Sequence, residues 1–189
     1  MISMQEMQAL RQIERRHMIG VKNAFAAGLD LSSKGKTPTF AFYKACIDYL
    51  TFILGRFNAQ GRGNTDRLRP LVSDSPDDLK IVDDIDAMLD KSEKEIVLLS
   101  NAMDTYARHQ ESGQGAFEEA GRHYIAFYGS TFVRRKDPAQ HIIARHFSDE
   151  EYWRLTNDFT PESITTEQRL FAAVAQTAPK GVSAEWSPQ

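Results

Sequence analysis

The 189-residue chain has little of several features that would narrow its function. Its single cysteine, Cys46, cannot form an intrachain disulfide, and the chain begins without a basic segment followed by an apolar one. No apolar run approaches the roughly 18 residues that cross a bilayer. The net charge of −3, with both signs interspersed, provides no strongly basic face for a phosphate backbone. We therefore expect a cytoplasmic protein that binds neither membranes nor nucleic acid.

Strand patterns are also absent, and apolar residues recur at helical spacing instead. One apolar stripe occupies residues 4–27 and ends near Gly28. A second helix is predicted to begin at Thr37 and Pro38, a cap followed by a proline in the first turn. Two glycines then weaken the pattern, and the helix is expected to stop before Pro70.

Two further long helices follow in the second half of the chain. One begins at Ser75 and Pro76 and ends near the segment ESGQG, either as a single helix or as two helices joined near Lys91. The next carries a stripe of aromatic residues that begins at Phe117, and Pro138 stops it. Four long amphipathic helices joined by polar loops can bury their stripes against one another.

The sequence therefore predicts an all-α fold, an up-down-up-down four-helix bundle over residues 1–160. Within it, Ser148 and Glu151 have the spacing of a capping box that starts a short helix. A C-terminal helix is expected at residues 161–178, packed on the bundle, and residues 179–189 form a tail.

Two segments resemble parts of the hemerythrin-like family, whose helical bundles hold a di-iron site with histidines and carboxylates. The segment FYGSTFVRRKD is similar to the fourth-helix segment that runs into His-x-x-x-Glu in that family. The segment FSDEEYWRL is similar to the acidic helix start with tryptophan that often follows it. The resemblance covers about residues 5–160 and implies the four-helix bundle.

Most of the ligand positions that this resemblance implies hold other residues. His17 matches the histidine of the first helix. The remaining positions would fall on Gln60 or Gly61, Asn64 or Thr65, Ser92, Thr131 and Arg135. A di-iron centre needs about five or six imidazole and carboxylate donors. The Arg135 guanidinium would take the place of a cation. We therefore expect no cofactor, with iron as the alternative.

Two sets of residues remain as candidate sites. Glu14 and His17, three residues apart on one helix face, are the candidate metal ligands, and an ion-paired couple is the other interpretation. If Arg135 is interior, it needs a carboxylate, and Glu14 is the candidate by type. The second set shares one face of the fourth helix and could line a small polar pocket for an anionic or carbonyl ligand: Tyr124, Tyr128, Thr131 and Arg135.

These observations favour a hemerythrin-like protein that lacks the usual di-iron site and binds a small ligand or a protein partner. A homodimer is compatible with this interpretation. The alternative is a non-haem iron protein that binds oxygen, peroxide or nitric oxide through a rearranged ligand set built on Glu14 and His17. A metal-free enzyme comes third, because no nucleophile and base have a persuasive spacing. Cys46 lies among apolar residues and is expected to be an inert buried thiol.

Overall fold

A computed structural model of the chain describes residues 3–131 and 139–185, and these residues form helices but no strands. The helices are α1 (Met4–Ser33), α2 (Phe40–Leu71), α3 (Pro76–His109), α4 (Glu111–Thr131), α5 (Gln140–His146), α6 (Asp149–Leu155) and α7 (Pro161–Thr177). The predicted all-α class is confirmed. None of the described helices is both long and apolar enough to span a bilayer.

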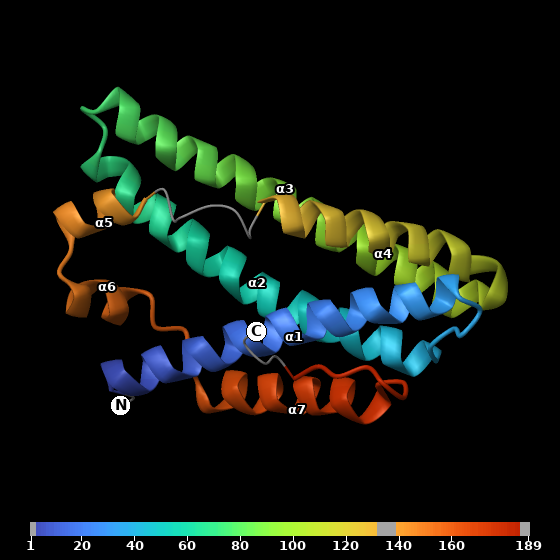
Figure 1. Cartoon of the computed structure of the whole chain (residues 1–189). Helices are drawn as coiled ribbons and strands as arrows, with labels where there is room; N and C mark the ends of the chain where they lie inside the picture. The colour runs from blue at the N-terminus through green and yellow to red at the C-terminus, as the bar shows by residue number, and fades with distance from the viewer. Residues whose placement is uncertain (1–2, 132–138, 186–189) are drawn as a thin grey trace.

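The four long helices pack in the order of the chain. Each contacts the next, and α4 also contacts α1 (Figure 1). Helix α7 packs mainly against α2 and also touches α1, whereas α5 contacts α2 and α6 contacts α1. Helix α2 therefore lies between the α3–α4 pair and the pair formed by α1 and α7.

The main hydrophobic core lies between α1, α2, α3 and α4 and is rich in aromatic rings. Phe25, Tyr43 and Phe117 are completely buried, and the rings of Tyr43 and Phe117 meet edge to face with centroids 5.1 Å apart. Helix α7 adds Val174 to this core, and Ala184 beyond it is also buried there. The described part of the segment expected to be a tail therefore packs on the core.

Helix α1 does not end near Gly28 but continues to Ser33. A Cβ atom at Gly28 would lie 2.7 Å from Cε1 of Phe42, so this glycine allows α1 and α2 to approach closely. The next helix begins later than predicted. Thr39, not Thr37, is its N-cap, and the Thr39 hydroxyl accepts a hydrogen bond from the Phe42 backbone amide at 3.3 Å.

Helix α2 continues through both glycines of its second half and ends at Leu71, so the predicted stop before Pro70 is wrong. Pro70 lies in the last turn, where its missing amide removes one hydrogen bond without dividing the helix. Gly61 also has a packing role, because a Cβ atom there would lie 2.9 Å from Cδ2 of Leu89 on α3. Both glycines that interrupt the hydrophobic pattern are therefore compatible with a long helix.

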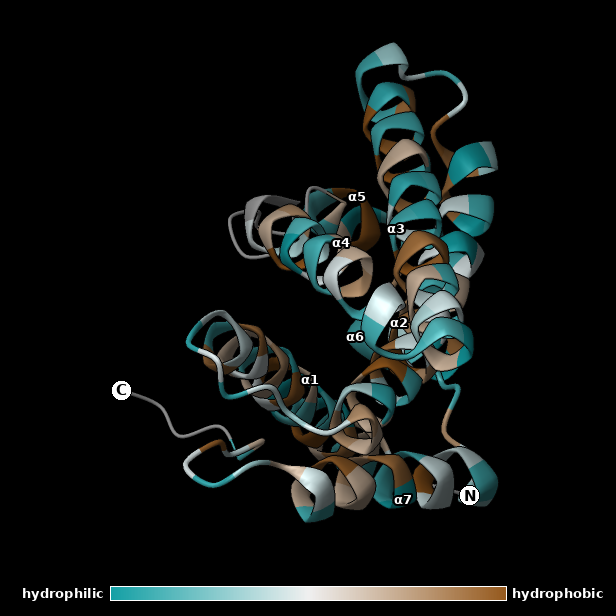
Figure 2. Cartoon of the chain, turned by 90° about the vertical axis from the view of Figure 1, so that its right-hand side faces the viewer, coloured by the Kyte–Doolittle hydropathy of each residue, from teal (hydrophilic) through white to brown (hydrophobic). Residues whose placement is uncertain are grey.

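Helix α3 is a single helix, so the division near Lys91 is not found. Gln110, whose φ is 46°, is the only residue between α3 and α4. The predicted capping box is confirmed, because the Ser148 hydroxyl accepts from the Glu151 amide and the Glu151 carboxylate accepts from the Ser148 amide. Where α2 and α3 approach their connecting loop, most residues are hydrophilic (Figure 2). Ion pairs link the two helices there, including Arg69 with Asp83 at 2.7 Å.

Candidate functional site

A group of paired charges, two of them deeply buried, lies where α1 meets α2 and the segment between α6 and α7. Arg11 and Glu14 of α1 are only 5% and 4% exposed. Arg56 of α2 and Asp158, which precedes α7, complete the group. We call these four residues the arginine–carboxylate cluster. Its two positive and two negative charges cancel.

Both carboxylates of the cluster contact both arginines. Arg11 donates from Nη1 to Oε2 of Glu14 at 2.9 Å and from Nη2 to Oδ1 of Asp158 at 2.6 Å. Arg56 donates from Nη1 to Oε1 of Glu14, and its Nη2 lies 3.0 Å from Oδ2 of Asp158. Each oxygen of Glu14 thus faces a different guanidinium group. This fork geometry suits arginine, whose planar donors match a carboxylate.

An aromatic ring covers both guanidinium groups of the cluster. The Phe159 ring lies 4.7 Å from Cζ of Arg11 and 5.2 Å from Cζ of Arg56, so one ring contacts both guanidinium groups. Burial raises the pKa of Glu14, and this effect exceeds the opposing effects of Arg56 and Arg11. Burial therefore disfavours the ionised form of Glu14. Its contacts with Arg11 and Arg56 favour that form and oppose the effect of burial.

A second polar group lies next to the cluster, at the junction of α1, α2 and α7. Tyr49 donates from its hydroxyl to Oε1 of Glu167 at 2.8 Å, and Nδ1 of His17 lies 2.8 Å from the same oxygen. The His17 ring stacks on Phe171 with centroids 3.7 Å apart. Burial and the Glu167 carboxylate raise the pKa of Tyr49. We call His17, Tyr49 and Glu167 the Glu167 triad, and it fixes α7 to the two helices beneath it.

A carboxylate that orients a half-exposed histidine is also found in enzymes with a histidine base. Such a base needs a nucleophile or a substrate proton within reach. Among the described residues, no hydroxyl or thiol hydrogen-bonds to the other ring nitrogen of His17. The only cysteine, Cys46, is completely buried within the core, and burial raises the pKa of its thiol. The triad therefore has the geometry of a structural contact.

Glu14 and His17 both lie near the interior, but the structure gives them different partners. Glu14 faces Arg11 and Arg56, while His17 faces Glu167. Within residues 3–131 and 139–185, no three side chains of histidine, cysteine, aspartate or glutamate gather to hold a metal ion. Two guanidinium groups on one carboxylate would repel a dication. The residues around Glu14 thus do not fit a metal site.

Most other positions at which the resemblance implies iron ligands carry neutral side chains bonded within the protein. Gln60 donates to the backbone oxygen of Thr156 at 3.0 Å. Asn58 donates to the hydroxyl of the buried Ser92 at 3.4 Å. Thr65 donates to a carboxylate oxygen of Asp86 at 2.5 Å. These bonds link α2 with α3 and with the end of α6.

The second candidate set is only partly described. Tyr124 and Tyr128 are buried, with the Tyr128 hydroxyl 3.5 Å from the sulfur of Met18, and burial raises the pKa of Tyr128 to about 12. Neither tyrosine lines the hollows described below. Thr131 is the last residue of α4, but its side chain and all of Arg135 lie outside the described residues. The sequence suggested Glu14 as the partner of Arg135, but Arg11 and Arg56 already bind this carboxylate.

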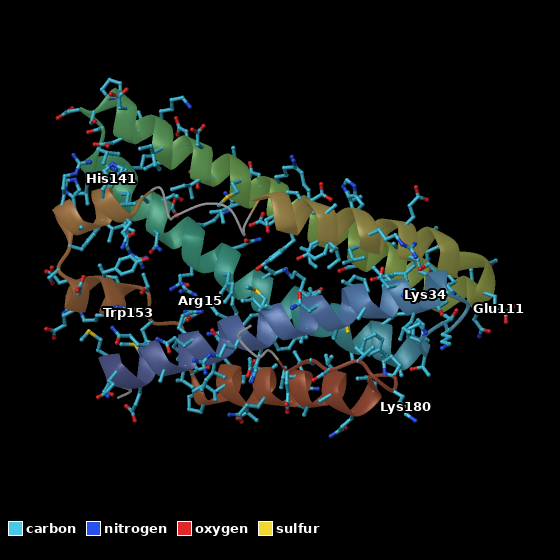
Figure 3. The ribbon with its side chains drawn as sticks, in the orientation of Figure 1. Arg15, Lys34, Glu111, His141, Trp153 and Lys180 are labelled. Atoms are coloured by element: carbon cyan, nitrogen blue, oxygen red, sulfur yellow. The ribbon has the colours of Figure 1, made fainter. Side chains whose placement is uncertain are left out.

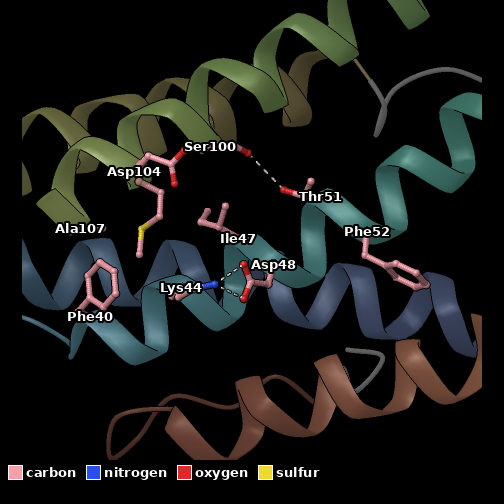
Figure 4. Close-up of a pocket in the computed structure, with 10 residues that line it drawn as sticks. Phe40, Lys44, Ile47, Asp48, Thr51, Phe52, Ser100, Asp104 and Ala107 are labelled. Atoms are coloured by element: carbon pink, nitrogen blue, oxygen red, sulfur yellow. Dashed lines mark hydrogen bonds and ion pairs between the residues drawn. The ribbon is translucent and has the colours of Figure 1, made fainter.

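An open groove lies on a different part of the surface, between α2 and α3 (Figure 4). Phe40 and Phe52 lie at its two ends, and Ile47 lies between them. Its volume is about 350 Å³. Thr51 and Ser100 approach each other across it, with hydroxyl oxygens 3.3 Å apart. We call this feature the α2–α3 groove and define it by Phe40, Ile47, Phe52, Met103, Asp104 and Ala107.

The groove continues into a second hollow at the turn between α3 and α4. This hollow has a volume of about 460 Å³ and shares Phe40 and Ala107 with the first. Glu111, which begins α4, lies on its edge and marks that end of the molecule in Figure 3. Phe40 and Ala107 therefore line both the α2–α3 groove and the hollow beside it.

Comparison with family models, with curated proteins and with solved structures gives no match to this chain. The residues that sequence analysis missed are Arg11, Tyr49, Arg56, Asp158 and Glu167. Only Arg11 could have been found from the sequence, because it lies three residues before Glu14 on the same helix face. The others lie far from Glu14 and His17 in the sequence, where helical spacing carries no information about contact.

Proposed function

We propose that this chain is a hemerythrin-like, up-down-up-down four-helix bundle that has lost the di-iron site and acts by binding a protein partner. The packing of each long helix on the next, with α4 returning to α1, supports the bundle. The observation that carries the proposal is the ion pairing of Glu14 with Arg11 and Arg56. Positive charge is already present where an iron ion would need a ligand.

The open surface supports binding rather than catalysis. The buried polar groups bond to one another, whereas the α2–α3 groove leaves apolar side chains within reach of a partner. Phe40, at one end of the groove, is 36% exposed. Exposed aromatic residues in concave surfaces are characteristic of binding sites.

The iron content of the purified protein tests this proposal. The full chain should be expressed with added iron, purified without a histidine tag and analysed by elemental analysis and by absorption in air. We expect far less than one iron per chain and no visible charge-transfer band, because a single histidine beside arginine-bound Glu14 leaves most coordination positions to water. An established di-iron protein prepared in parallel is the control.

One or two irons per chain, with a band that disappears in His17→Ala, would overturn the proposal and favour the oxygen, peroxide or nitric oxide alternative. Iron that remains in His17→Ala would overturn it as well, and would place the ligands elsewhere in the chain.

A further inference from the structure

The α2–α3 groove has the length of a short helix. Phe40 and Phe52 are about 18 Å apart along α2 at about 1.5 Å per residue. A partner helix of about three turns would cover this distance. The described residues contain no strand to which a partner could add another strand, so an occupant must be held by side chains. A helix that lays its apolar face into a groove is the recognition mode that fits this geometry.

The floor of the groove is apolar, and its rim combines apolar with polar and charged side chains. Ile47 and Met103 are 3% and 5% exposed and form its floor. Phe40 remains more open, with its ring edge to face against Tyr106 at 5.2 Å. Val97 is 53% exposed and lies one helical turn before Ser100 on the same side of α3. A partner with apolar residues on one helical face would remove the exposed Phe40 and Val97 side chains from water, whereas Ile47 and Met103 are already buried.

Carboxylates without an ion-pair partner among the described residues lie in the groove and in the adjoining hollow. Lys44 and Asp48 neutralise each other, with Nζ of Lys44 2.6 Å from Oδ2 of Asp48. Asp104 and Glu111, by contrast, take part in none of the ion pairs between described residues. Arg108 donates to the backbone oxygen of Asp104 and not to its carboxylate. Two carboxylates thus remain available to a cationic partner.

From this length, apolar lining and charge, we infer that the α2–α3 groove binds a basic amphipathic helix of a partner protein. The inference rests on the proposed function and names the class of partner. Apolar residues at intervals of three and four enter the groove beside Phe40, and lysine or arginine residues on the flanks approach Asp104 and Glu111. Basic charge steers the encounter, and apolar contact holds the complex.

The experiment is a selection from a library of 14-residue helical peptides with randomised surface positions, made against the full chain. The best synthetic peptide then serves as the probe in fluorescence anisotropy. Ala107→Trp fills the shared part of the groove, and Asp104→Lys reverses its charge. Both residues are exposed, so the core is untouched. The matched controls outside the groove are the exposed Ala126→Trp and Asp66→Lys.

We expect the selected peptides to carry one apolar stripe flanked by lysine and arginine. Ala107→Trp should weaken binding of the probe at least about tenfold, and Asp104→Lys about three- to tenfold at low salt, with a smaller effect at high salt. Ala126→Trp and Asp66→Lys should leave the dissociation constant unchanged. Thermal unfolding of each variant verifies that it is folded.

Several results would overturn the inference. These are the absence of enriched peptides, peptides with acidic flanks, or a probe that binds Ala107→Trp as tightly as the parent. Sedimentation showing a dimer that Ala107→Trp dissociates would assign the groove to a second copy of this chain. Failure of the peptide test in an iron-free protein refutes only the groove assignment, whereas iron in the protein refutes the proposed function itself.

Discussion

Glu14→Ala should lower the free energy of unfolding by about 3 to 5 kcal/mol, because it removes the more deeply buried of the two carboxylates that Arg11 and Arg56 share. Arg11 and Arg56 have side chains only 6% and 13% exposed, so water cannot replace the lost partner. Asp158, which is 30% exposed, is left to balance both charges. Urea unfolding, monitored by circular dichroism, measures the change. The dependence of the unfolding free energy on urea concentration should be the same in the variant and the parent.

Asp48→Ala is the matched control, since it removes a carboxylate from an exposed pair. The Lys44 and Asp48 side chains are 54% and 44% exposed, and such pairs contribute less than about 1 kcal/mol. An equal loss in Glu14→Ala and Asp48→Ala would show that the arginine–carboxylate cluster is not buried as described.

Gly113→Ala should have the second largest effect, a loss of about 2 to 3 kcal/mol. The added Cβ atom would lie 2.9 Å from Cα of Tyr106 and 3.0 Å from the backbone oxygen of Thr105. Both are backbone atoms of α3, so no side-chain rotation can relieve the overlap. The turn at Gln110 leaves α3 and α4 little freedom to separate. The same urea unfolding experiment measures the loss.

Gly115→Ala, two residues further along α4, is the control. A Cβ atom there meets nothing within 4 Å, and alanine is the better helix former by up to about 1 kcal/mol. We expect this variant to be slightly more stable than the parent. If both alanine variants change stability in the same direction and to the same extent, the close approach of α3 and α4 at Gly113 is wrong.

The sequence predicted where the helices lie better than where they end. Capping residues such as Ser148 and Glu151 act within one turn, so their spacing is visible in the sequence. Gly28 wrongly predicted the end of α1, because this glycine allows a close contact with Phe42 of the next helix. Pro70 gave another, since a proline in the last turn costs only one hydrogen bond. Local signals cannot distinguish a glycine that ends a helix from one that permits packing.

Of the arginine–carboxylate cluster, the helical pattern of the sequence indicated only Glu14. Glu14 was correctly placed on the inward face of its helix, but His17 is only half-buried and Arg11 is the deeply buried neighbour. Arginine is rarely buried without a partner, so composition alone assigns Arg11 to the surface. Its pairing with Asp158 joins residues at opposite ends of the chain. Such pairing depends on tertiary packing and has no signature in helical spacing.

The central claim, that guanidinium groups rather than a metal neutralise Glu14, is tested most directly by anomalous diffraction from crystals of the full chain soaked in Mn²⁺ or Fe²⁺. The account predicts that both oxygens of Glu14 contact Arg11 and Arg56 and that no anomalous peak lies at this carboxylate. A peak at bonding distance from Glu14 or from His17, with the arginines displaced, would contradict it.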